Sequence, residues 1–436
     1  MKRKPGGALS AESLIKTVSV CAKNILDETT RNKPQISLHD NILSAIAIFK
    51  LKYPSLLQFD NDRQDPAHAH NLKTLFHVDQ APCDTALRER LDLLEPHKLR
   101  KIFTTLFSVA QRNKVLEDYH YLSEGYLCSI DGTGCFHSEI VHCENCCEKK
   151  HRDGSTSYYH QMLCGVIVHP NQSHVIPLCP EPILKPDGSA KNDCERNASK
   201  RFLTDLKREH PHLKLVILED SLASNAPHIR LIEELGYQYI IGVKPGDHKW
   251  LFDWVGACSK EVVELTESNR NQHRLEFVNN VPLNEFNEDV RVNFLEHWET
   301  RPNGKVIHHT WVSSILLTKD NVFEVMKGGR TRWKVENETL NTLKTQGYHF
   351  EHNFGHGEKN LSTVFSFIMM IAFLIDELGF IGCHLMQQTR ETLLGKKRMW
   401  QKIRSAFDSY FITCWQDLFD FFIGKVRKPP LPANTS

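Results

Sequence analysis

The chain has 436 residues, more than a single hydrophobic core usually supports, so we expect two or three structural units. Its 40% hydrophobic and 25% charged residues, without a low-complexity tract, exclude a collagen-like or wholly disordered chain and are typical of a folded protein. The 54 basic and 53 acidic residues nearly cancel. This balance neither indicates nor excludes nucleic-acid binding, because opposite charges can lie on different faces.

The cysteines and the start of the chain predict a reducing, cytoplasmic setting. Thirteen cysteines are an odd number, and the basic residues 1–4 are followed by Pro5 and two glycines rather than by the apolar core of a secretory signal. The longest apolar run, residues 364–375, is interrupted by Ser366 and is shorter than the roughly 20 residues of a membrane span. It therefore predicts a buried helix and no membrane association.

Residues 1–120 are predicted to form an all-helical unit. Ser37 and Asp40 have capping-box-like spacing at the start of a helix that reaches Phe49, and a second helix is expected to begin at Asp84. Further amphipathic helix follows after Pro96. Several basic residues here are either a solvated surface or contacts to a DNA backbone: Lys50, Lys52, Arg88 and Arg90. We therefore interpret residues 1–120 as a candidate DNA-binding arm.

The middle of the chain, residues 121–245, predicts alternating strands and helices. The pattern predicts strands at 126–130, 162–168 and 175–178, a helix from Asp193 to Arg208, a strand at 213–218, a helix opened by Asn225 and Pro227, and a strand at 239–243. The first strand should deliver Asp131 at its carboxyl end, before the turn residues Gly132 and Gly134. The fourth should end at Glu219 and Asp220.

Three neighbouring strands followed by alternating helices and strands are the order of a ribonuclease-H-like core, an α/β fold with a mixed sheet. The helical crossovers make the first and fourth strands parallel neighbours. Asp131 and Asp220 are therefore expected side by side at the edge where open α/β sheets place their ligands. Residues 330–385 are expected to complete this catalytic domain.

Residues 246–329 predict a β-rich insertion, because alternating apolar segments recur at 274–278, 290–294 and 306–315. A helix is then expected over residues 332–344, beginning after Gly328 and Gly329 and ended by Gly347. The rest of the chain is predicted to be helical, with residues 386–436 as a C-terminal region.

Asp131, Asp220 and Glu336 are the candidate catalytic residues. Cleavage or joining of a phosphodiester without covalent catalysis requires an activated water or hydroxyl and a stabilised leaving oxygen, which two Mg²⁺ ions about 4 Å apart can supply. Two acids at strand ends and one from a facing helix are suitable ligands for Mg²⁺ or Mn²⁺. For any single acid the alternative is a turn or a helix cap, and Glu338 competes with Glu336 for the third position.

Three segments resemble the DDE transposases of bacterial insertion sequences: Ser129-Ile-Asp131-Gly-Thr-Gly134, Leu218-Glu-Asp220 and Arg332-Trp-Lys-Val-Glu336. The closer resemblance is to the branch whose third acid lies in a Tyr-x-x-Arg-x-x-x-Glu-x6-Lys helix after a β-strand insertion domain. It covers roughly residues 120–350. The tyrosine position of that signature falls on Gly329 and the lysine position on Leu343, with Lys344 beside it.

The resemblance implies a transposase that cleaves double-stranded DNA at the ends of its element and transfers the strands into target DNA, with Mg²⁺ held by Asp131, Asp220 and Glu336. It also implies a homodimer on DNA in the nucleoid-associated cytoplasm of a bacterium. Arg332 and Lys344 would bind DNA phosphates. Lys344 lies about 80° from Glu336 on a regular helix, so only a local irregularity would bring both to one place.

Other interpretations stay open beside this one. A catalytically inactive, transposase-derived DNA-binding protein is consistent with the missing tyrosine and the shifted lysine. A stand-alone nuclease of the same fold would cut without end specificity and without strand joining. Trp298 and Trp311 are candidates to stack on a flipped base, with packing in the core as the alternative.

One loop has the ligand types and the close spacing of a zinc site, with the candidates Cys143, Cys146, Cys147 and His151. No second paired motif follows at the usual finger spacing, so free cysteines and histidines in a loop are the alternative. Three basic residues of the loop could equally face DNA: Lys149, Lys150 and Arg152. Glu195 could supply a supporting carboxylate to the catalytic acids, but a capped helix start explains it as well.

Overall fold

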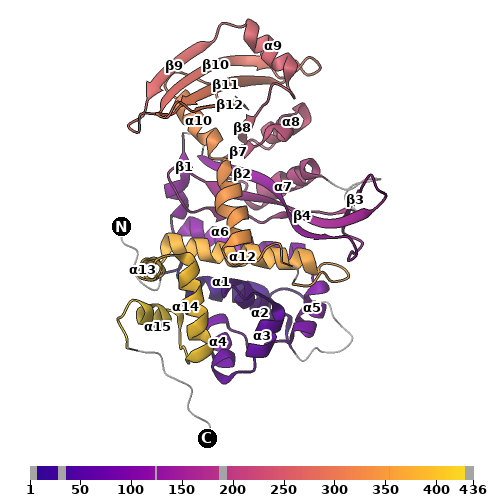
Figure 1. The fold of residues 1–436 in the computed structure, drawn as a ribbon, viewed down its shortest axis with the longest axis vertical. Coiled ribbons are helices and arrows are strands. Elements are labelled where there is room, and N and C mark those ends of the chain that lie inside the picture. The colour runs from indigo at the N-terminus through magenta and orange to yellow at the C-terminus, as the bar shows by residue number, and fades with distance from the viewer. Residues whose placement is uncertain (1–6, 28–35, 123–124, 186–193, 353, 428–436) are drawn as a thin grey trace.

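The computed structural model describes residues 7–27, 36–122, 125–185, 194–352 and 354–427. The molecule is elongated, with a β-rich end, a central sheet flanked by helices, and a helical unit at the other end (Figure 1). It is a mixed α/β protein, as the sequence predicts.

The N-terminal part of the described chain is helical. Its elements are α1 (Ala11–Lys23), α2 (Leu38–Lys50), α3 (Leu56–Asp62), α4 (Pro66–Phe76), α5 (Asp84–Asp92), η1 (Pro96–Leu99), α6 (Arg100–Arg112) and η2 (Val115–Tyr119). Ser37 caps α2 as expected, since its hydroxyl accepts a hydrogen bond from the backbone N–H of Asp40 at 3.0 Å. Lys50 and Lys52 fit neither expected alternative, a solvated surface or a DNA contact, because both side chains are buried and form ion pairs with Asp376.

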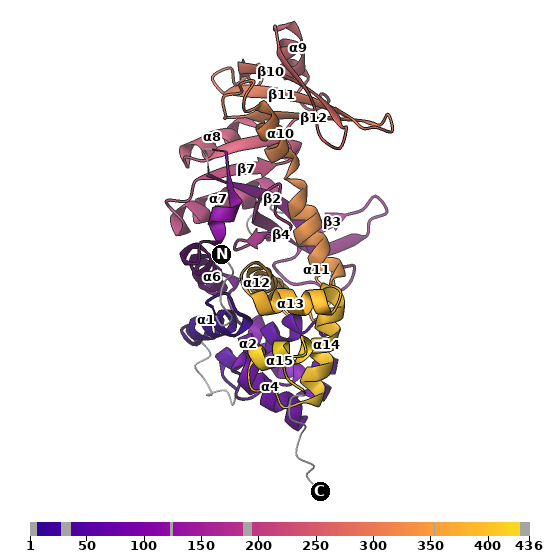
Figure 2. The same cartoon turned by 90° about the vertical axis from the view of Figure 1, so that its left-hand side faces the viewer.

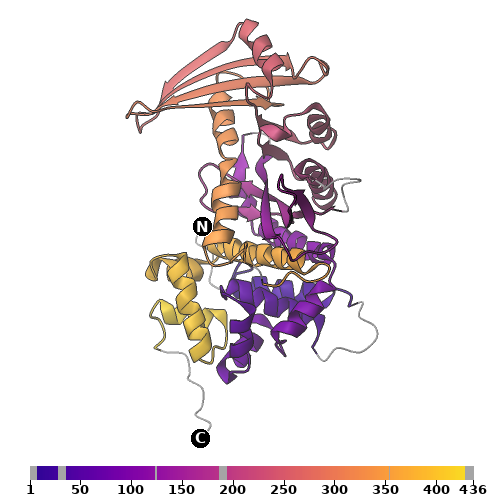
Figure 3. The same ribbon diagram turned by 45° about the vertical axis from the view of Figure 1, so that its right-hand side comes forward.

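The C-terminal helices pack against the N-terminal ones around one central helix. They are α12 (Leu361–Gly382), α13 (His384–Thr392), α14 (Lys396–Ser409) and α15 (Trp415–Phe422). Helix α12 packs on α1, α2, α5 and α6, and α14 packs on α4, so the two ends of the chain share one helical unit (Figure 3). With 22 residues, α12 is long and apolar enough to cross a membrane, but 94% of its most apolar window is buried inside the protein. It is the buried helix that the apolar run predicts.

One mixed sheet of twelve strands runs through the described part of the chain. The strands are β1 (His120–Tyr121), β2 (Gly125–Ser138), β3 (Cys147–Lys150), β4 (Thr156–Val168), β5 (Ile176–Pro177), β6 (Glu181–Ile183), β7 (Leu215–Glu219), β8 (Gln238–Gly242), β9 (Glu261–Thr266), β10 (Gln272–Pro282), β11 (Arg291–Thr300) and β12 (Val306–Ser313). The main order is β3-β4-β2-β7-β8-β12-β11-β10-β9, with β5 and β6 also paired to β4. Only the β2–β7 and β7–β8 pairs are parallel among these described strands.

The parallel pairs result from helical crossovers, α7 (Glu195–Glu209) before β7 and α8 (Ala226–Glu234) before β8. Asn225 caps α8 as predicted, because its side-chain oxygen accepts a hydrogen bond from the His228 N–H at 3.1 Å. Asp193, the predicted cap of the preceding helix, lies outside the described residues.

Strand β2 differs from the expectation at Asp131. The residues after Asp131 were expected to turn, but β2 continues to Ser138 with one irregularity between Gly134 and Phe136. The reason is β4, whose long antiparallel partnership with β2 includes the pair Asp131–Cys164 and holds the strand extended. Asp131 therefore lies inside a strand rather than at its end.

The predicted β-rich insertion is an extension of the central sheet. It contains α9 (Lys249–Ala257) and strands β9 to β12, and β12 joins the sheet by pairing antiparallel with β8. The chain then returns along the side of the sheet through α10 (Val322–Arg330), the π-helical η5 (Val335–Leu340) and α11 (Asn341–Thr345) (Figure 2).

The helix expected after Gly328 and Gly329 is present from Trp333, but the sequence did not predict α10, which begins at Val322 and runs through both glycines. They allow close packing rather than ending a helix. A Cβ atom on Gly329 would lie 2.7 Å from the indole nitrogen of Trp311, and one on Gly328 would lie 3.2 Å from Ile240 and from Tyr121. The helix predicted over residues 332–344 is also irregular, since its middle is π-helical.

Candidate active site

The sheet register brings the two candidate aspartates together. Strand β2 pairs with β7 from Tyr126 opposite Leu215 to Ser129 opposite Leu218, and two residues further along each chain lie Asp131 and Asp220. Asp220 follows the end of β7 and caps the short helix η4 (Ser221–Ala223), where its carboxylate accepts a hydrogen bond from the Leu222 N–H at 2.9 Å. The expected neighbourhood of these acids is therefore present.

Glu336 joins them from the start of η5, which packs against β2 and β4. The pKa of Asp131 reflects how close these groups lie. Burial raises the pKa of Asp131 above its usual value, the Arg332 guanidinium opposes the rise, and the carboxylates of Asp220 and Glu336 add to it. Glu338, the rival third acid, is exposed and acts electrostatically on Lys334. Glu336 is therefore the acid of this helix that faces the aspartates.

Arg332 contacts the acids directly. Its guanidinium Nη1 lies 3.2 Å from Asp131 Oδ2, while Asp131 Oδ1 accepts a hydrogen bond from the Gly132 N–H at 2.9 Å. The Ser129 hydroxyl on β2 donates a hydrogen bond to the Arg332 carbonyl at 2.8 Å. This bond attaches the backbone of Arg332 to β2. Arg332 thus lies at the site, where it is paired with the Asp131 carboxylate.

Glu195 is a fourth acid at this site. Its carboxylate lies directly over Gly132, where it occupies the space that a Cβ atom would need, and it lines one pocket with Asp131 and Asp220. Although Glu195 as a residue is exposed, burial of its carboxyl group raises its pKa, and Asp131, Asp220 and Glu219 raise it further. The sequence offers only the helix start as a signal for Glu195, because no spacing relates it to the other acids.

Glu219, the neighbour of Asp220, has a different role. Its buried carboxylate accepts a hydrogen bond from the Ser199 hydroxyl at 2.8 Å and contacts the His228 imidazole, so it ties α7 and α8 to the end of β7. This leaves Asp220 as the acid of the pair with a solvent-accessible position. The four remaining carboxylates, with one arginine among them, form a set of hard oxygen donors of the kind that Mg²⁺ and Mn²⁺ prefer.

A basic groove begins at the acids and runs along the insertion. It is lined by Asp220 and Asn337, by the cations Lys244, Arg301, Arg330 and Arg332, and by Trp311, Trp333, His308 and His309. Arg301 and Arg330 both form ion pairs with the buried carboxylate of Glu299 on β11. The groove therefore combines aromatic surface with four cationic side chains next to the acids, and three of these cations are paired with carboxylates.

The tryptophans of this region differ in accessibility. Trp311 is only 6% exposed and packs against Gly329, and Trp298 stacks on His308 with 5.0 Å between the ring centroids. Trp333 is 52% exposed and lies beside Arg332, whose guanidinium carbon is 5.9 Å from the centre of the indole. Sequence reasoning missed Trp333, although its position next to Arg332 was a usable signal.

Lys344 lies outside this groove. Its ammonium group forms an ion pair with Glu351 at 2.7 Å and lines a separate pocket with Trp400 and Arg404. The π-helical turn of η5 is a local irregularity of the kind that could bring Lys344 to the same side as Glu336. The Lys344 side chain is nevertheless directed to Glu351.

The structure brings together only two of the four residues predicted as zinc candidates. Cys143 and Cys146 meet two histidines from distant segments, His160 and His356. The assignments of Cys147 and His151 to this group are wrong, because Cys147 starts β3 and directs its thiol to the Ile183 carbonyl at 3.6 Å. His151 contacts the Ser157 hydroxyl at 2.9 Å instead. Adjacent residues of an extended chain point to opposite sides, so Cys146 and Cys147 face different partners.

Comparison with known proteins identifies no family: no family model matches the chain, and a search of curated proteins finds no match. The chemistry of the site is therefore judged from its own residues and their positions.

Proposed function

We propose that this protein is a DNA transposase of the DDE type, which cleaves DNA at the ends of an insertion sequence and transfers the strands into target DNA with Mg²⁺. The observation that carries the proposal is the convergence of Asp131 and Asp220 from parallel neighbouring strands with Glu336 from the helix packed against them. Three such acids are a suitable set of ligands for phosphodiester chemistry by two metal ions.

The strand order supports a ribonuclease-H-like catalytic core. Strand β2 lies between antiparallel β4 and parallel β7, β5 and β6 pair with the far side of β4, and β8 continues the parallel side. The ribonuclease-H-like order predicted from the sequence has this pattern. The sheet extension β9 to β12 would then be the insertion that precedes the third acid.

Asp131, Asp220 and Glu336 would hold the metal, with Glu195 close enough to support one of them. Bound metal ions would supply an activated water and would stabilise the leaving oxygen. Arg332 balances the charge of Asp131, and its forked guanidinium is suited to a DNA phosphate beside the same carboxylate.

DNA would follow the basic groove between the acids and the insertion. Lys244, Arg301 and Arg330 would contact phosphates without regard to sequence, and the half-exposed Trp333 offers a face on which a base can stack. Synapsis of two element ends would require two copies of the chain on DNA. We expect the protein to act in the cytoplasm of a bacterium, at its nucleoid.

The inactive DNA-binding alternative has one specific observation in its favour. The lysine that the family signature requires is represented only by Lys344, and this side chain is paired with Glu351 in a separate pocket. A protein that kept the groove but lost turnover would still bind element ends.

Cleavage of labelled DNA carrying the element's own ends tests the proposal. Wild type is compared with Asp131→Ala, Asp220→Ala and Glu336→Ala, and Glu338→Ala is the matched control on the same helix. We expect nicking at the ends by wild type and by the control, and binding without cleavage by the other three. If all five proteins bind and none cleaves with Mg²⁺ or Mn²⁺, the inactive alternative holds.

A further inference from the structure

A cluster of two cysteines and two histidines lies at the base of the β3–β4 hairpin, apart from the catalytic acids. Cys143 and Cys146 belong to the loop before β3, His160 lies on β4, and His356 belongs to the segment that leads into α12. We propose that these four side chains bind a structural Zn²⁺ ion, which fastens the hairpin to the helical unit.

Five of the six distances among the four ligand atoms are close to those of a tetrahedral zinc site. Zn–S bonds of about 2.3 Å and Zn–N bonds of about 2.0–2.1 Å place ligand atoms about 3.8 Å apart for S–S, 3.5 Å for S–N and 3.3 Å for N–N. The Cys143–Cys146 distance is 3.9 Å, and the distance between the two Nε2 atoms of His160 and His356 is 3.2 Å.

The sulfur–nitrogen distances agree as well. His160 Nε2 lies 3.5 Å from Cys143 Sγ and 3.3 Å from Cys146 Sγ, and His356 Nε2 lies 3.2 Å from Cys146 Sγ. All four ligand atoms lie within 4.8 Å of one another. Four donor atoms this close together can converge on a single ion.

A hydrogen bond outside the cluster prepares His356 for this role. Its Nδ1 lies 2.8 Å from the Gly357 carbonyl oxygen, which can only accept a hydrogen bond, so the proton is assigned to Nδ1. The lone pair of Nε2 then points into the cluster. Metal-ligating histidines commonly have such a carbonyl partner on the other ring nitrogen.

Burial makes an unfilled cluster costly. Cys146, His160 and His356 are 1%, 2% and 5% exposed, and the Phe136 ring covers His356 with 4.3 Å between the centroids. Two thiolates would balance the charge of Zn²⁺, so the loaded site would be neutral.

Other roles for the cluster fit less well. A disulfide between Cys143 and Cys146 would require a bond of about 2.05 Å in place of the observed 3.9 Å separation. Four protein ligands leave no open position for water or substrate, which distinguishes a structural site from a catalytic one. Sulfur and imidazole ligands also exclude Mg²⁺ as the preferred ion.

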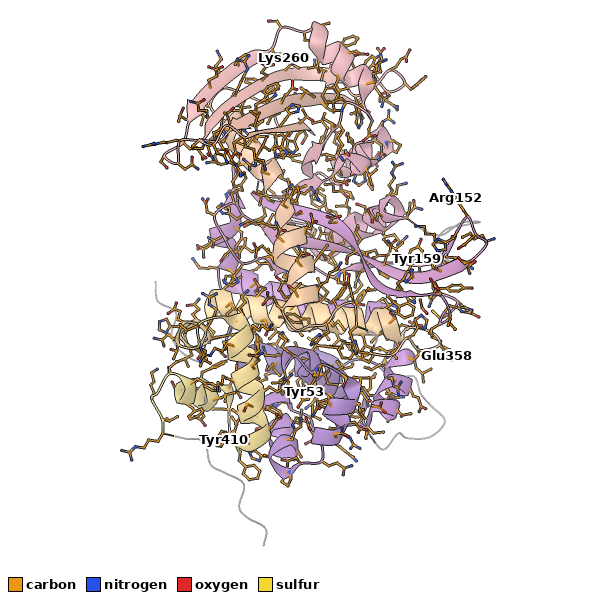
Figure 4. The ribbon with its side chains drawn as sticks, viewed as in Figure 1. Tyr53, Arg152, Tyr159, Lys260, Glu358 and Tyr410 are labelled. Atoms are coloured by element: carbon orange, nitrogen blue, oxygen red, sulfur yellow. The ribbon has the colours of Figure 1, made fainter. Side chains whose placement is uncertain are left out.

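The proposed ion would join parts of the chain that are far apart in sequence. The segment after His356 is held by Asp92 at the end of α5, whose carboxylate accepts hydrogen bonds from the N–H groups of Glu358, Lys359, Asn360 and Leu361 at 2.9–3.0 Å. Asn145 donates to the Lys359 carbonyl at 2.9 Å. In Figure 4, Glu358 lies near the helical unit below the hairpin strands, with Tyr159 on β4 and Arg152 at the hairpin tip.

Two consequences follow for the hairpin. Its tip bears the exposed residues Lys149, Lys150 and Arg152, and its strand β4 pairs with β2 at Asp131. Zinc would therefore fix a basic arm relative to the helical unit and restrain the strand next to a catalytic acid. The proposal does not depend on the transposase assignment, because the cluster stands on its own ligands.

The test is elemental analysis of the purified full-length chain, together with thiol titration. We expect one zinc per chain in the wild type, and loss of that zinc in Cys143→Ser, Cys146→Ser and His356→Gln. Cys194→Ser and His151→Gln are matched controls that should keep the metal, because Cys194 is exposed and His151 contacts Ser157. These readouts involve no DNA and no cleavage.

A second measurement avoids variants that fail to fold. Exchange of the wild type with Co²⁺ should give the visible absorption of a tetrahedral site with thiolate ligands, and added Zn²⁺ should abolish it. Wild type without zinc and without this Co²⁺ spectrum would overturn the proposal. So would a Cys143–Cys146 disulfide in the native protein, or equal loss of zinc in His151→Gln and His356→Gln.

Discussion

Replacing Asp376 with alanine should strongly destabilise the protein. The Asp376 carboxylate is 1% exposed and contacts Lys50, which is wholly buried, Lys52 at 2.8 Å and the Tyr348 hydroxyl at 2.5 Å. Removing the acid leaves the amino groups of Lys50 and Lys52 buried in the helical unit without the carboxylate that stabilises their charge, and burial already lowers the pKa of Lys52 to about 7. Breaking a buried ion pair from one side costs about 3–5 kcal/mol, and we expect a loss of that size for Asp376→Ala.

Urea denaturation followed by circular dichroism measures this loss. The matched control is Asp79→Ala, which removes an acid from a Lys–Asp pair at the surface, where Asp79 is 77% exposed and Lys73 lies 3.3 Å away. A pair of this kind contributes about 0–1 kcal/mol, so the control should unfold almost like the wild type. If Asp376→Ala and Asp79→Ala had equal free energies of unfolding, the reasoning about Lys50 and Lys52 would be refuted.

Three further predictions concern the groove and the acids. Gly329→Ala should lower the free energy of unfolding by about 1–3 kcal/mol, seen as a lower melting temperature, because the added Cβ would lie 2.7 Å from Trp311. Gly134→Ala, whose Cβ would meet open space, should leave the melting temperature unchanged. Trp333→Ala should weaken binding of element-end DNA by about 1–3 kcal/mol in a fluorescence-anisotropy titration, and Trp254→Ala, exposed on α9, should leave it unchanged. Arg332→Ala should shift the acid limb of the pH–cleavage profile to higher pH, because Arg332 lowers the pKa of Asp131 and only the ionised Asp131 carboxylate would bind the metal. An unshifted acid limb would show that the ionisation of Asp131 does not set the pH dependence of cleavage.

Short-range sequence patterns predicted the helix caps and the order of the central strands. The caps at Ser37 and Asn225 and the order of the central strands follow from residues a few positions apart, and the parallel β2–β7 pair then follows from the helical crossovers. The position of α10 could not be predicted in this way, because glycines such as Gly328 and Gly329 commonly mark the end of a helix. Here their lack of a side chain accommodates Trp311 and Ile240, which only the tertiary structure reveals.

The candidate site shows the same division. Asp131, Asp220 and Glu336 could be inferred from strand order and from a resemblance. For Glu195 the sequence leaves a supporting carboxylate and a capped helix start as alternatives, and only the position of its carboxylate over Gly132 distinguishes them. His160 and His356 are separated from Cys143 by 17 and 213 positions, so no spacing rule connects them. Their meeting depends on how the hairpin folds back and on where the segment before α12 passes.

Electron paramagnetic resonance of Mn²⁺ added to the protein with element-end DNA tests the central claim most directly. The account predicts that wild type and Glu338→Ala bind Mn²⁺ tightly and that Asp131→Ala, Asp220→Ala and Glu336→Ala lose it. Equal Mn²⁺ binding by all five proteins would contradict the claim that these three acids hold the metal.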